Sequence, residues 1–96
     1  LKALEFELPD WDAFPCLGLA YTAGRCGDTA PAWLNASNEI AVEAFLAGKL
    51  SWAGIAEVLD AALSVWPGGP ADTVEAVLDA DQSARLVAAS LVEARL

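Results

Sequence analysis

The segment from Thr29 to Gly48 places the strongest constraint on the fold, because it carries the signals for both ends of one long helix. Thr29 is a candidate N-cap, and Pro31 follows in the first turn, where its missing N–H does no harm. Gly48 marks the end, since glycine is common just past the last turn of a helix. The sequence therefore predicts one helix of ordinary length over this segment.

Only one narrow stripe of this predicted helix is polar. Asn35, Glu39 and Glu43 follow one another at helical spacing and so share a face. Apolar residues cover the two flanks: Leu34, Ala41, Val42 and Phe45 on one side, and Trp33, Ile40 and Ala44 on the other. A helix that is apolar over most of its circumference is expected to lie at the centre of a domain.

Asn38 lies outside the polar stripe, on the flank that carries Leu34 and Phe45. An amide in such a position is costly unless its donors and acceptors find partners. We therefore predict that Asn38 is buried and hydrogen-bonded.

Further helices are predicted on both sides of the central one. Pro15 can begin a short helix that runs to Gly24. Ser51 is a good N-cap for another helix, and Leu50 and Ile55 have the spacing of a hydrophobic staple around it. The apolar face of that helix consists of Ile55, Val58, Leu59, Ala62 and Trp66. The Pro-Gly-Gly-Pro sequence that follows ends it.

The last third of the chain contains two capping-box spacings, first Asp72 with Glu75 and then Asp79 with Gln82. Two caps seven residues apart predict a short helix, a bend and a final helix. The inward side of the final helix is expected to consist of Ala84, Val87, Ala88 and Leu91. Together these elements predict an all-α fold, a compact bundle of four to five helices over residues 13–96.

The first residues alternate between apolar and acidic side chains: Leu4, Glu5, Phe6, Glu7 and Leu8. This is the period of a half-buried extended segment, which suits either an arm laid across the helices or a linker from a preceding domain. The linker is favoured because the sequence opens without Met, as a fragment would. Residues 1–12 are therefore assigned as an extended linker arm.

Composition excludes several classes of function. The formal charge of −9, with only five basic residues, would repel a phosphate backbone, so nucleic-acid binding is not expected. The sequence shows neither a run approaching the roughly 20 apolar residues of a membrane span nor a secretory signal, which favours the cytoplasm. With no His, and with Cys16 and Cys26 not adjacent, the usual zinc sites are excluded, and both thiols are expected to be free.

Three blocks carry a resemblance to a known family: Pro9-Asp10, Phe14-Pro15-Cys16-Leu17, and the run from Leu34 to Leu46. Their order and spacing are similar to the C-terminal helical domain of 1-deoxy-D-xylulose 5-phosphate reductoisomerase, and residues 51–59 and 73–80 extend the similarity over nearly the whole chain. The resemblance implies a left-handed superhelical bundle. Ser37 stands where the family usually has Ala, and its hydroxyl can bond back to a helix carbonyl without disturbing the fold.

The resemblance also implies the activity of a parent enzyme. That family is a homodimeric, NADPH-dependent enzyme of bacteria and plastids, which uses Mg²⁺ or Mn²⁺ to convert 1-deoxy-D-xylulose 5-phosphate to 2-C-methyl-D-erythritol 4-phosphate in isoprenoid synthesis. Nucleotide, metal and substrate binding belong to two other domains of the parent, and their motifs are not in this sequence. The implied role of this domain is to support the catalytic domain, without catalytic, cofactor-binding or metal-binding residues of its own. The residues expected to carry that structural role are Asn38, Phe45, Leu34, Pro15 and Ser51.

Other interpretations of the polar and aromatic residues are less favoured. Asn35, Asn38 and Glu39 could form a catalytic group, but no perturbed partner is evident beside them. Four acidic residues could bind a divalent cation, although helix capping explains them better: Asp72, Glu75, Asp79 and Asp81. Four tryptophans could line a ligand pocket, although core and interface packing is favoured: Trp11, Trp33, Trp52 and Trp66. The alternative function is a free-standing acidic helical adaptor, which would need an apolar groove open to solvent.

Overall fold

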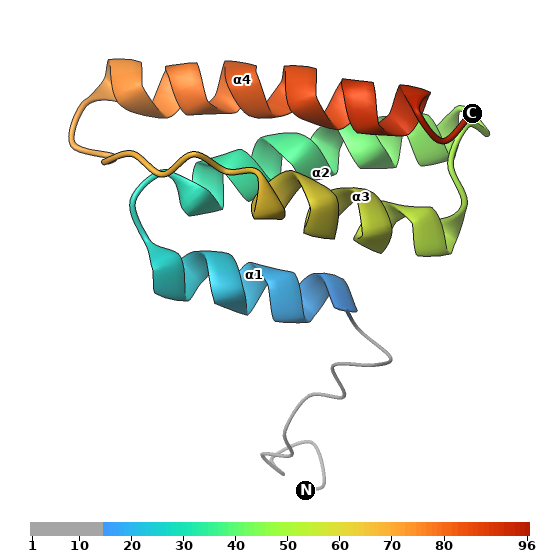
Figure 1. The fold of residues 1–96 in the computed structure, drawn as a ribbon, viewed down its shortest axis with the longest axis horizontal. Coiled ribbons are helices and arrows are strands. Elements are labelled where there is room, and N and C mark those ends of the chain that lie inside the picture. Colours follow the sequence, from blue (N-terminus) through green and yellow to red (C-terminus); the bar gives the residue numbers. More distant parts are fainter. Residues whose placement is uncertain (1–14) are drawn as a thin grey trace, which may run out of the picture.

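The structure is a computed structural model that describes residues 15–96, and these residues form four helices (Figure 1). These are α1 (Pro15–Cys26), α2 (Ala30–Leu46), α3 (Trp52–Ser64) and α4 (Val74–Glu93). The described part of the chain contains no strand, so the prediction of an all-α fold is confirmed. The linker arm predicted for residues 1–12 lies outside the described residues.

The helix α2 is central, as its apolar circumference predicts. It contacts all three other helices, as does α3, whereas α1 and α4 do not contact each other. Figure 1 shows α4 and α1 on opposite sides of a middle layer made by α2 and α3. The α4 side of this layer is therefore covered over its length, whereas the shorter α1 covers the other side only in part.

Small side chains let these helices approach closely. Alanines are prominent among the buried residues, with Ala36 and Ala41 of α2 and Ala84 and Ala88 of α4 fully inaccessible to solvent. The larger core residues include Val58, Leu59 and Ile55 of α3 and Trp33 and Leu34 of α2. A core of this kind depends on close backbone contact, because alanine brings little surface of its own.

The predicted end of α2 and the predicted start of α3 are confirmed. However, α3 ends at Ser64, so Trp66 lies beyond the helix on whose apolar face it was predicted, and α1 continues past Gly24 to Cys26. At the end of α2, the N–H of Lys49 donates to the oxygen of Ala44 over 2.8 Å, and the N–H of Gly48 donates to that of Phe45 over 3.0 Å. This is a Schellman motif, in which Gly48 adopts the positive φ of 78° that side chains disfavour. At the start of α3, the Ser51 hydroxyl accepts a hydrogen bond of 3.0 Å from the N–H of Gly54.

The bend predicted near Asp79 is wrong, because α4 is one unbroken helix of 20 residues. Its cap is Thr73, whose hydroxyl accepts a hydrogen bond of 3.0 Å from the N–H of Ala76, rather than Asp72. The segment contains neither glycine nor proline, so nothing interrupts the backbone ladder. Asp79 and Gln82 are both exposed and are therefore tolerated in the interior of the helix.

Candidate functional site

A groove of about 1180 Å³ lies between α1 and α3, with α2 contributing to its lining. The larger apolar side chains that line it include Leu17, Leu19, Tyr21, Val42, Trp52 and Ile55. The groove exists because α1 packs on both α2 and α3 without covering the whole face of the middle layer. Arg25 and Asp60 bring opposite charges to its lining.

Asn38 belongs to this groove and is exposed, so the prediction of a buried amide is wrong. The helical wheel placed it correctly beside apolar residues, since Val42, one turn further along α2, also lines the groove. However, no helix among residues 15–96 covers that part of α2. Its amide makes no hydrogen bond with another described side chain.

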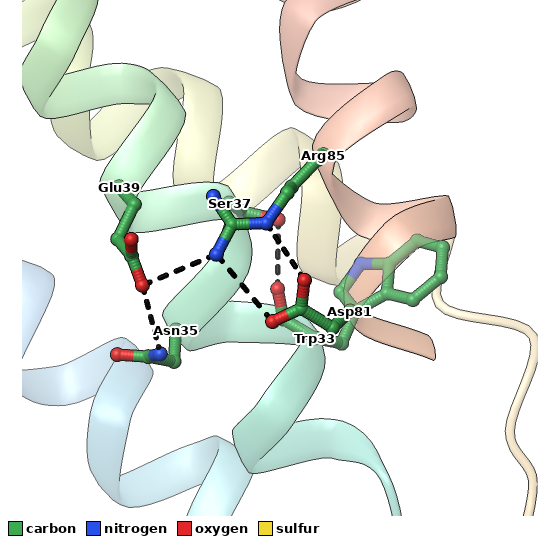
Figure 2. A network of polar contacts seen from close by, with 6 residues as sticks. All are labelled: Trp33, Asn35, Ser37, Glu39, Asp81 and Arg85. Atoms are coloured by element: carbon green, nitrogen blue, oxygen red, sulfur yellow. Dashed lines mark hydrogen bonds and ion pairs between the residues drawn. The ribbon is translucent and has the colours of Figure 1, made fainter. Parts of the chain in front are cut away.

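A second polar feature joins α2 to α4 (Figure 2). The Arg85 guanidinium lies between Asp81, one turn earlier in α4, and Glu39 of α2. Its Nε is 2.7 Å from Asp81 Oδ1, and its Nη2 is 3.3 Å from Glu39 Oε2. The same Glu39 oxygen accepts a hydrogen bond of 3.3 Å from the amide of Asn35. The polar stripe of α2 therefore faces a cation as well as solvent.

This network holds charge rather than moving protons. The hydrogen bond from Arg85 to Asp81 is the main cause that raises the pKa of the guanidinium above its ordinary value. An arginine stays protonated throughout the physiological range and cannot act as a general acid or base there. The catalytic interpretation of Asn35, Asn38 and Glu39 gains no support, because Asn38 lines the groove whereas the other two belong to this network.

One buried hydrogen bond ties α2 to α3, and a second one lies within α2. The indole N–H of Trp33 donates to the oxygen of Ala62 over 2.8 Å, and Trp33 is only 3% exposed. Its own main-chain oxygen accepts a hydrogen bond of 2.8 Å from the Ser37 hydroxyl, which is completely buried. The expected back-bond of Ser37 is therefore confirmed, and a polar residue is accommodated in the core without an unpaired group.

Thr29 fastens the loop after α3 to the start of α2. It occupies the predicted N-cap position, but its hydroxyl makes no capping hydrogen bond. The sequence therefore predicts the position of Thr29 correctly but not its hydrogen-bond partners. Instead the hydroxyl donates to the oxygen of Gly69 over 3.0 Å and accepts from the indole N–H of Trp66, also over 3.0 Å. The N–H of Thr29 donates to the same Gly69 oxygen.

The other residues assigned a structural role occupy distinct places. Pro15 is the first residue of α1 and lines the groove. Leu34 is buried in the core, and the partly buried Phe45 packs against it as well as against Trp52, with a ring-centroid separation of 5.5 Å. Of the tryptophans, Trp33 is buried and Trp66 is half-buried, whereas Trp52 is exposed and Trp11 lies outside the described residues.

The described residues supply little of the chemistry of an active site. Among residues 15–96, no three His, Cys, Asp or Glu side chains lie close enough to hold a metal ion. Cys16 and Cys26 are exposed free thiols. Over the same range, no helix is both long enough and apolar enough to cross a membrane.

Three of these contacts were not predicted from the sequence. The spacing of Asp81 and Arg85 by one helical turn is a signal for their pairing, and it could have been found. The contact between Arg85 and Glu39 joins two helices and leaves no comparable local signal. The same holds for Trp66 and Thr29, which are 37 residues apart.

Comparison with known proteins places these features in a family. The family model of the DXP reductoisomerase C-terminal domain matches residues 1–87. The 1-deoxy-D-xylulose 5-phosphate reductoisomerase of Cupriavidus taiwanensis is 54% identical over 92 residues, which is 96% of this chain and 23% of that protein. The enzyme of the same name from Cupriavidus necator is 57% identical over 82 residues, which is 85% of this chain and 21% of that protein.

A solved structure agrees with these sequences. The 1-deoxy-D-xylulose 5-phosphate reductoisomerase of Zymomonas mobilis in complex with NADPH superposes with a TM-score of 0.85 at 39% identity, over 93% of this chain and 24% of that one. The chain therefore spans less than a quarter of the length of these relatives.

Proposed function

This chain belongs to the 1-deoxy-D-xylulose 5-phosphate reductoisomerase family, of which it is the C-terminal domain, and on that premise we propose that it supports the catalytic domain of such an enzyme. The whole protein would reduce and rearrange 1-deoxy-D-xylulose 5-phosphate to 2-C-methyl-D-erythritol 4-phosphate with NADPH. The observation that carries the proposal is the family match over residues 1–87, together with a helical bundle that superposes on a relative solved with NADPH.

We infer that the domain contributes structure and not chemistry. Its described polar groups are engaged in helix caps and interhelical contacts, or are surface groups without a cluster of metal ligands. Leu34, Phe45 and Ser51 would act by keeping the bundle rigid, and Pro15 and Asn38 by shaping its groove. Residues 1–12 would serve as the linker from the preceding domain.

The cofactors and partners follow from the same premise. NADPH and a divalent cation, Mg²⁺ or Mn²⁺, would be held by the rest of the full-length chain. For the cation this agrees with residues 15–96, which bring no three His, Cys, Asp or Glu side chains together. The parent would be a homodimer in the bacterial cytoplasm. Its dimer contacts need not involve this domain.

The test removes the domain from the full-length chain that contains it. NADPH oxidation with 1-deoxy-D-xylulose 5-phosphate and Mn²⁺ is measured for the full-length chain, for the chain lacking residues 15–96, for the 96-residue fragment alone, and for the truncated chain mixed with the fragment, and the melting temperatures of the first two are compared. We expect the full-length chain to turn over and the truncated chain to lose activity or melt earlier. The fragment alone should be inactive, and its addition should restore activity to the truncated chain. A truncated chain with full-length kinetics and melting temperature would disprove the supporting role.

A further inference from the structure

The groove between α1 and α3 leaves several large apolar side chains exposed to solvent. Leu17 is 41% exposed, Tyr21 is 52% exposed and Trp52 is 75% exposed, and all three line the groove. Single exposed apolar residues are ordinary, but several around one concavity mark an interaction surface. Aromatic residues are enriched in the buried centres of protein interfaces, because they bury a large area with few rotatable bonds.

The position of chain entry indicates what covers the groove. Pro15 is both the first residue of α1 and a lining residue of the groove, so the polypeptide that precedes α1 leaves from the groove's edge. The relatives are more than four times as long as the matched segment, and the segment is their C-terminal domain. A large preceding domain is thus tethered next to the groove, at the high effective concentration that a short linker provides.

Another group of exposed apolar side chains lies on the opposite side. Val74, Leu78 and Leu86 of α4 are exposed, but α4 does not contact α1 and lies across the middle layer from it (Figure 1). The preceding domain would have to reach around the bundle to cover them. Because the chain enters α1 beside the groove, the groove is favoured over the α4 surface as the contact site of the preceding domain.

We propose that the groove receives an apolar ridge of the preceding domain of the full-length chain, seated between α1 and α3 with Trp52 and Leu17 against it. This inference rests on the proposed function, because it takes the preceding domain from the family. The exposed amide of Asn38 supplies a donor and an acceptor for the main chain of that ridge. Arg25 and Asp60, which form no ion pair within residues 15–96, offer opposite charges to its flanks.

Hydroxyl-radical footprinting of the full-length chain and of the 96-residue fragment tests the assignment directly. Oxidation of Trp52 should be at least about threefold slower in the full-length chain, since an interface centre is desolvated. Oxidation of Leu86 on α4 serves as the internal reference and should change much less. Each sample is also measured after tenfold dilution, which separates a tethered domain from a second copy.

Two matched variants of the full-length chain each add one carboxylate, the first in the groove and the second on α4. Ala53→Glu lies in the groove, at an exposed position in the first turn of α3 where an acidic residue suits the helix dipole. Ala89→Glu makes the same change at an exposed position of α4. We expect Ala53→Glu to restore rapid oxidation of Trp52, and Ala89→Glu to leave it slow.

Each result decides the proposal. Equal oxidation of Trp52 in fragment and full-length chain, or slow oxidation that survives Ala53→Glu, would overturn it. Slow oxidation that is lost on dilution would assign the groove to a second copy and would also overturn it. A failure of the proposed function would look different, because the full-length wild-type chain would then show no turnover with NADPH and substrate whatever the state of Trp52.

Discussion

The indole nitrogen of Trp33, in α2, lies 2.8 Å from the main-chain oxygen of Ala62, in α3, and both residues are buried. This hydrogen bond crosses the contact between two neighbouring helices near the end of α3. The same carbonyl also accepts a weaker bond of 3.3 Å from the N–H of Val65. Trp33 therefore combines apolar burial with a polar anchor, and its removal should disturb both.

Trp33→Phe should destabilise the fragment by about 1–3 kcal/mol, because it removes a buried hydrogen bond and part of a buried ring. The matched control is Trp52→Phe. Trp52 is exposed and contacts Phe45 edge to face, a contact that Phe can keep, so this change should cost less than about 0.5 kcal/mol. Urea unfolding curves give both values. Equal losses would show that the Ala62 contact adds nothing.

Thr29→Val keeps the shape of the side chain and removes the hydroxyl that Trp66 and Gly69 share. Because Thr29 is only 3% exposed, we expect a loss of about 1–3 kcal/mol in unfolding free energy. The emission of Trp66 should change as well. Thr22→Val is the control, since the Thr22 hydroxyl is exposed and bonds only to Gly18 of its own helix. A Thr29 variant as stable as the Thr22 variant would contradict the assigned role of the loop contact.

Gly48→Ala should destabilise the fragment by about 1–2 kcal/mol, since an L side chain is strained at the positive φ of its Schellman motif. Gly24→Ala is the opposite case. Gly24 lies within α1, and an added Cβ would meet no atom within 4 Å. Gly24→Ala should therefore stabilise the fragment by about 0.5–1 kcal/mol. Thermal unfolding of the two variants should therefore shift in opposite directions. A shift in the same direction would show that conformational freedom does not decide these positions.

Cys16 should react more slowly in the folded chain than its unfolded thiol does. Although Cys16 is exposed, partial burial of its thiol raises the pKa through desolvation, so folding favours the protonated form. The corresponding stability is fully present below the pKa of the unfolded thiol and is lost as the pH rises through the folded pKa. Alkylation of the Cys26→Ser variant, measured against pH with and without urea, should reach half its maximal rate at higher pH when folded. Coincident profiles would rule out the effect.

Local signals determined the helices of this protein. A helix is marked at its start by Pro15 or Ser51, at its end by Gly48, and along its length by the apolar circumference of α2. Each of these signals acts over one or two helical turns, so the sequence suffices to place the helices. The same locality explains the false bend in α4, because a capping-box spacing states only that a helix could begin at Asp79. Whether an unbroken helix prevails depends on its packing against α2.

Tertiary structure alone decided how the helices use their polar groups. The sequence placed Asn38 on an apolar flank, but burial depends on which helix covers that flank, and within residues 15–96 none does. Thr29 stands at an N-cap yet bonds to a loop 40 residues away, and Glu39 meets Arg85 from another helix. Helical periodicity assigns a residue to a face, whereas the partner of that face is set by long-range packing, which no local pattern records.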